Sequence, residues 1–94
     1  MPPHPLEIGP AGQAAARALV RTRTARGYSQ RQLATRITAQ GRRMTFTALS
    51  RIERRARRCD IDDLVAIAAA LGVSPCALLG GPAEPLEPVS AGAT

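Results

Sequence analysis

The sequence predicts an all-α domain built from five short helices. Alanine supplies much of the apolar fraction, Tyr28 and Phe46 are the only aromatic residues, and four helix-start signals fall between residues 28 and 78. Strands draw on β-branched and aromatic side chains, and the sequence contains no strand pattern. We therefore expect helices and no sheet.

The chain of 94 residues has the length of one domain, since domains usually hold roughly 100–200 residues. Prolines and glutamates are concentrated at its two ends. We expect residues 1–9 and 82–94 to be flexible tails without regular structure, and residues 10–81 to form the folded domain.

The first two helices have clear boundaries in the sequence. One is expected over residues 11–26 and ends at Gly27, because glycine readily takes the left-handed conformation that follows many helices. The second is expected over residues 30–40. Ser29 just before it and Gln32 in its first turn form a capping box, in which each side chain accepts a hydrogen bond from the other residue's backbone N–H.

Three further caps predict three further helices, over residues 46–54, 61–71 and 75–79. The capping residues are Thr45, Asp60 and Ser74, each between two apolar residues as in a hydrophobic staple. Gly41 and Gly72 would end the second and fourth helices. The apolar residues at helical spacing are assigned to one core: Leu19, Leu33, Ala34, Ile37, Leu49, Ile52, Leu64, Ile67, Ala68, Leu71 and Leu78.

The charge of the chain is strongly positive and unevenly distributed. All thirteen basic residues are arginines, and they lie between residues 11 and 81 with only four acidic residues. Such a surface is typical of a protein that binds a polyanion, although a basic surface also serves solubility alone.

Several classes of protein are excluded by what the sequence lacks. No apolar run approaches the ~18 residues of a membrane span, and no signal peptide is visible, so we expect a cytoplasmic protein. Cys59 and Cys76 have no histidine nearby, which predicts neither a zinc site nor a disulfide. With His4 as the only histidine and no phosphate-binding loop, we expect no catalysis, cofactor or metal.

The helices over residues 30–40 and 46–54 are short, capped and closely connected, which is the organisation of a helix-turn-helix. In such a pair, the second helix places its N-terminal residues in the DNA major groove. The first helix crosses the backbone, where its N-terminus can hold a phosphate.

The stretch from Arg23 to Leu79 resembles the Cro/C1-type, or Xre-like, helix-turn-helix family, whose members share a lambda repressor-like fold. The resemblance rests on an ordered set of residues at the family's spacing: Arg23, Gly27-Tyr28-Ser29-Gln30, Leu33-Ala34, Leu49-Ser50-Arg51-Ile52-Glu53, Leu71-Gly72-Val73-Ser74-Pro75 and Leu78-Leu79. It implies a compact five-helix DNA-binding domain.

The resemblance also implies roles for individual residues. Base contacts are expected from Phe46, Thr47, Ser50, Arg51 and Gln30. Contacts to the DNA backbone are expected from Ser29, Arg42, Arg43, Thr45, Arg54 and Arg55. In the family, the residues at the positions of Arg23 and Glu53 pair inside the domain, and we expect that salt bridge here.

Some of these residues have a second interpretation. Arg51 either pairs with guanine, which is worth ~1–3 kcal/mol of discrimination, or binds a phosphate. Phe46 either packs against thymine methyl groups or is a buried staple residue, and we expect it to be exposed. The arginine run after residue 53 is either a clamp on the DNA backbone or a solvated loop in which Arg57 pairs with Glu53. Three aspartates near residue 60 are explained by a helix N-terminus, where negative charge is favourable.

Two features depart from the family pattern. The connection over residues 38–43 is longer than usual, and we expect the helix before it to reach Gln40 and Gly41 to end it. Arg55 stands where the family usually has glycine. Either the helix continues past Glu53, or Arg55 takes the left-handed conformation at a cost of about 1 kcal/mol.

The predicted function is sequence-specific binding of double-stranded DNA to regulate transcription, as a repressor and a homodimer on a palindromic operator. The alternative is an antitoxin-type module that binds a partner protein and regulates its own operator. The arginine-rich, lysine-free composition points to a bacterial source of high GC content.

Overall fold

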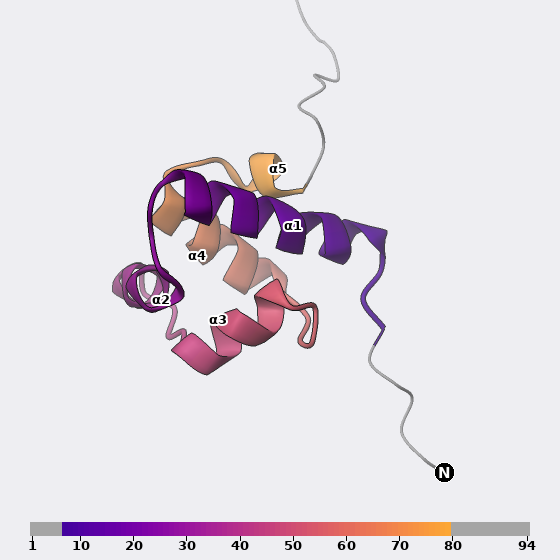
Figure 1. Cartoon of the computed structure of the whole chain (residues 1–94), viewed down its shortest axis with the longest axis horizontal. Helices are drawn as coiled ribbons and strands as arrows, with labels where there is room; N and C mark the ends of the chain where they lie inside the picture. Colours follow the sequence, from indigo (N-terminus) through magenta and orange to yellow (C-terminus); the bar gives the residue numbers. More distant parts are fainter. Residues whose placement is uncertain (1–6, 80–94) are drawn as a thin grey trace, which may run out of the picture.

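The computed structural model describes residues 7–79, which form five helices around one core (Figure 1). The helices are α1 (Pro10–Ala25), α2 (Gln30–Ala39), α3 (Phe46–Glu53), α4 (Ile61–Leu71) and α5 (Pro75–Leu78). Every predicted helix is confirmed to within one residue at each end. No strand occurs between residues 7 and 79, so the all-α prediction is confirmed. Most of both predicted tails, residues 1–6 and 82–94, lies outside the described residues.

The predicted caps account for the starts of four helices. Ser29 Oγ accepts a hydrogen bond from Gln32 N at 3.0 Å, and Gln32 Oε1 accepts one from Ser29 N at 2.8 Å. Thr45 and Ser74 cap α3 and α5 through their hydroxyl groups, and Asp60 caps α4 through its carboxylate, which accepts a hydrogen bond from Asp63 N. These bonds satisfy backbone N–H groups that a helix start otherwise leaves unpaired.

The core lies between α4 and the helices that surround it. Helix α4 packs against α1, α2 and α5, and it buries Ala66, Ile67, Ala68, Ala70 and Leu71. All the predicted core residues are buried except Leu64, which packs against the core while remaining half-buried. Met44, in the connection before α3, is also a core residue with 4% exposure.

The long connection between α2 and α3 is ordered by Thr38. Its Oγ1 accepts a hydrogen bond from Met44 N at 3.0 Å and also lies 3.2 Å from the carbonyl oxygen of Met44. Helix α2 ends at Ala39, and Gly41 follows with φ +98°. The prediction that Gly41 ends this helix is therefore confirmed.

Arg55 takes the left-handed conformation, with φ +62°, and is the one non-glycine residue between positions 7 and 79 with a positive φ. Helix α3 ends at Glu53, so of the two alternatives for this turn the strained one is correct. Arg55 N donates to the carbonyl of Ile52 at 3.0 Å, and Ala56 N donates to that of Arg51 at 2.8 Å. This is the hydrogen-bond pattern of a Schellman motif, which glycine usually completes.

We expect Arg55→Gly to stabilise the domain by up to about 1 kcal/mol. The left-handed conformation costs a side-chain-bearing residue roughly 1–2 kcal/mol, and the greater freedom of glycine in the unfolded chain offsets part of that gain. The measurement is urea denaturation followed by circular dichroism. Arg54→Gly is the matched control, because Arg54 has φ −87° and should gain nothing. Equal stability of Arg55→Gly and the original protein would show that the turn is not strained.

Candidate nucleic-acid interface

Helix α3 presents one face to the core and the other to solvent. Leu49, Ile52 and Glu53 point inward, while Thr47 and Arg51 are exposed and Ser50 is half-buried. In Figure 1, α3 lies on the opposite side of the bundle from α5, with α2 beside it. The face expected to contact bases is thus open to a ligand as large as a DNA duplex.

Phe46 begins α3 and is 38% exposed, so its expected exposure is observed. The guanidinium carbon of Arg31 lies 4.5 Å from the centroid of its ring. This cation–π contact spans a groove between α2 and α3 that Thr35 and Met44 also line. Sequence reasoning missed Arg31, because only the packing of the two helices brings it to Phe46.

The carboxylate of Glu53 connects three helices at the C-terminal end of α3. Arg23 Nε donates to Glu53 Oε2 at 2.7 Å and Arg23 Nη2 to Oε1 at 3.1 Å. Gln30 Nε2 also donates to Oε1, at 2.8 Å, and Arg23 Nη1 donates to the carbonyl of Tyr28 at 2.9 Å. The end of α1 and the start of α2 are therefore both bound to the end of α3, and Arg23 also holds the turn that follows α1.

Gln30 has a role here that its expected base contact did not include. One hydrogen of its Nε2 is directed to Glu53, and a side-chain amide has a second N–H and an acceptor oxygen to offer. The contact with Glu53 fixes the direction of that remaining N–H. A phosphate accepts but does not donate, so this N–H is the group that suits a phosphate.

Arg42 departs from the DNA-backbone contact expected of it, because two carboxylates of the domain bind its partly exposed guanidinium group. Its Nε donates to Asp63 Oδ1 at 3.0 Å and its Nη2 to Asp60 Oδ2 at 3.0 Å. Two carboxylates thereby neutralise the charge that a phosphate would need, and they raise the pKa of Arg42. Arg57 also binds Asp63, through Nη2 at 3.4 Å. Its suggested pairing with Glu53 is therefore wrong, because Arg23 and Gln30 already occupy that carboxylate.

The other arginines expected to contact DNA are exposed around α3. Arg43 precedes the helix, Arg51 lies on it, and Arg54 and Arg55 follow it. Within residues 7–79, none of these four side chains forms an ion pair. Ser29 and Thr45 lie at the exposed N-termini of α2 and α3, where backbone N–H groups favour anions. Positive charge is thus available on both sides of the exposed face.

The comparisons with known proteins give the chain a family. A family model described as "Helix-turn-helix" matches residues 19–78, which include all of α2 and α3. The chain belongs to the Cro/C1-type helix-turn-helix family. A DNA-binding regulator of transcription is the function that this membership supports. No curated protein and no solved structure matches the chain.

Helices of the described residues are all too short or too polar to cross a bilayer. The residues matched by the family model include α2 and α3, which the hydrogen bond between Gln30 and Glu53 connects.

We expect Glu53→Ala to destabilise the domain by ~3–5 kcal/mol, because it leaves the guanidinium of Arg23 half-buried without its partner. The side chain of Glu53 is only 5% exposed and that of Arg23 17%. The measurement is the free energy of unfolding in urea. Asp62→Ala is the control, since Asp62 is exposed and its loss should cost well under ~1 kcal/mol. If the two variants are equally stable, the ion pair does not hold the helices together.

Proposed function

We propose that this protein is a sequence-specific repressor of transcription that inserts α3 into the major groove of double-stranded DNA. The observation that carries the proposal is the exposed polar face of α3, flanked on both sides by arginines that form no ion pair with any residue from 7 to 79. Polar groups on an exposed helix suit base edges, and flanking guanidinium groups suit phosphates on the two strands that border the groove.

The proposed base contacts come from four residues of α3 and one of α2. Arg51 pairs with guanine through two parallel hydrogen bonds, and Thr47 and Ser50 bond to base edges. Phe46 packs against a thymine methyl group, with Arg31 held over its other face. Gln30 contributes a base or phosphate contact through the N–H that Glu53 leaves open.

The proposed backbone contacts come from residues around α3. They are Ser29, Arg43, Thr45, Arg54 and Arg55. Arg42 is left out of this set, because Asp60 and Asp63 hold its guanidinium group. Neutralised phosphates release counterions, so each such arginine adds to the salt dependence of binding.

We further propose that the chain acts as a homodimer on a palindromic operator, with half-sites about 34 Å apart. Protein bound at a promoter would block transcription. The apolar surface formed by exposed residues of α4 and the end of α5 supports a protein interface: Ile61 is 75% exposed, Val65 50% and Leu79 49%. A second copy would cover this surface.

The same apolar surface supports a second candidate, an antitoxin-type module. A partner protein would then cover Ile61, Val65 and Leu79, none of which belongs to α3, so that α3 would stay free for the operator. Co-expression with a neighbouring small gene product, followed by size-exclusion chromatography, would distinguish a mixed complex from a homodimer.

The test of the proposed function is selection of bound fragments from a random duplex library at low and moderate salt. We expect one palindromic motif that persists at the higher salt. Binding that is uniform across sequences and lost with salt would contradict sequence reading and indicate a backbone-only binder.

We expect Arg51→Ala to weaken binding to the selected motif by ~1–3 kcal/mol and to relax the preference at one base pair. The measurement is a fluorescence-anisotropy titration against the motif and its single-base variants. Arg17→Ala is the control, since Arg17 is an exposed arginine of α1 and carries the same change of charge. A uniform loss across all base variants would assign Arg51 to a phosphate instead.

A further inference from the structure

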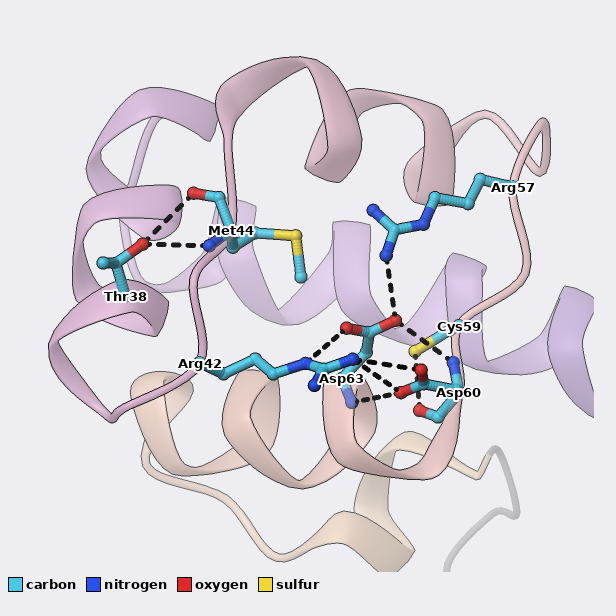
Figure 2. Close-up of polar contacts among 7 residues, drawn as sticks. All are labelled: Thr38, Arg42, Met44, Arg57, Cys59, Asp60 and Asp63. Atoms are coloured by element: carbon cyan, nitrogen blue, oxygen red, sulfur yellow. Dashed lines mark hydrogen bonds and ion pairs between the residues drawn. The ribbon is translucent and has the colours of Figure 1, made fainter.

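Asp63 is a buried carboxylate that two arginines share from opposite sides. Its side chain is only 2% exposed. Arg42 Nε donates to Oδ1 at 3.0 Å, and Arg57 Nη2 lies 3.4 Å from Oδ2. Figure 2 shows the two guanidinium groups reaching Asp63 from different connections of the chain. The backbone N–H of Asp60 also donates to Oδ2, at 3.2 Å.

The two arginines belong to the segments on either side of α3. Arg42 lies in the connection that precedes the helix, and Arg57 lies in the connection that follows it. Asp63 itself stands in the first turn of α4, whose next turns are buried in the core. The segments on both sides of the eight-residue helix α3 are thereby bound to the same carboxylate.

The connection before α3 is held at a second point. Thr38 on α2 binds the backbone of Met44, as Figure 2 shows, and the Met44 side chain is buried. Arg42 lies along the chain between Thr38 and Met44, and it also pairs with Asp60, at 3.0 Å. A connection that is longer than the family pattern is therefore fixed along its length by hydrogen bonds.

The ionisable groups around Asp63 favour its ion pairs with Arg42 and Arg57. The side chains of Arg42 and Arg57 are 37% and 38% exposed, whereas that of Asp63 is buried. The arginines can therefore remain partly hydrated while they bind the buried carboxylate. A hydrogen bond from the backbone N–H of Asp63, together with the charge of Arg42, lowers the pKa of Asp60. Burial, followed by the nearby Asp63 and Asp60, raises the pKa of Cys59 to about 11. The thiol therefore stays neutral at pH 7 and does not compete for the arginines.

We propose that Asp63 is a positioning residue for DNA recognition, which holds α3 at the angle needed to read bases by binding Arg42 and Arg57. This inference rests on the proposed function of α3 as the recognition helix. Base contacts demand close alignment, whereas contacts to phosphates alone tolerate a shift of the helix. We call the contacts of Asp63 with Arg42 and Arg57 the Asp63 clamp. Weakening this clamp should therefore reduce specific binding to DNA more than non-specific binding.

The first test compares three arginine variants, because Arg42 and Arg57 are exposed enough for the fold to survive their replacement. Each variant is titrated over a range of salt with the duplex obtained from selection and with an unrelated duplex of equal length. For Arg42→Gln and Arg57→Gln we expect the ratio of specific to non-specific affinity to fall about tenfold, as when one base contact is weakened, with an unchanged salt slope.

Arg43→Gln is the matched control, as an adjacent arginine with no ion pair among residues 7–79. We expect its salt slope to fall by about 0.9 and its specificity ratio to stay unchanged. If Arg42→Gln instead behaves as Arg43→Gln does, Arg42 binds a phosphate and the clamp is overturned.

The second test needs no DNA, so it separates failure of the clamp from failure of the proposed function. Amide hydrogen exchange is measured on the free protein and on Asp63→Asn, which keeps the size of the side chain. We expect at least tenfold faster exchange over residues 40–59 and unchanged exchange in α1. The outcome that overturns the clamp is a folded Asp63→Asn protein with unaltered exchange over residues 40–59. Failure of the selection to give any motif would contradict the recognition role of α3 itself.

Discussion

The arrangement of the helices depends on the hydrogen-bonded burial of the Glu53 carboxylate. A carboxylate removed from water is costly unless its oxygens are bonded to charged or polar donors. Here Arg23 supplies two donors and Gln30 a third. Because those donors come from α1 and α2, the helices must meet at the end of α3 to satisfy the charge. The same requirement sets the angle between α2 and α3.

Asp63 imposes a comparable requirement at the start of α4. Glu53 and Asp63 are the buried acidic side chains of the described region, and they lie on the two sides of the turn that contains Arg55. Glu53 ties α3 to the helices before it, and Asp63 ties the flanks of α3 to the helix after it. A short helix that buries only three residues is thus connected to its neighbours by ion pairs on both sides as well as by apolar contacts.

The sequence predicts the helices well because their limits are set by local chemistry. A capping residue and a glycine act over four or five positions, so Ser29, Asp60 and Gly72 carry the information themselves. The partners of Arg42 and Arg57 were not predictable in this way, because Asp63 lies 21 and 6 residues away along the chain. The contact between Arg31 and Phe46 likewise arises only when α2 packs on α3. The conformation of Arg55 was reduced to two alternatives, and only the observed end of α3 decides between them.

Every basic residue of the chain is an arginine. Some of these arginines pair with carboxylates inside the domain and others are exposed, and the chemistry of arginine suits both situations. A guanidinium group presents several N–H donors in a planar fork, which matches a carboxylate and a phosphate equally well. Arg23 uses three of its nitrogens on two partners inside the domain, which the single ammonium group of a lysine would not do with the same geometry. The exposed arginines around α3 present the same fork to solvent. Which role an arginine takes is then decided by whether a buried carboxylate lies within reach, as it does for Arg42 and does not for Arg43. Among residues 7–79, the placement of only a few acidic residues therefore determines which of the thirteen arginines are held in ion pairs within the domain.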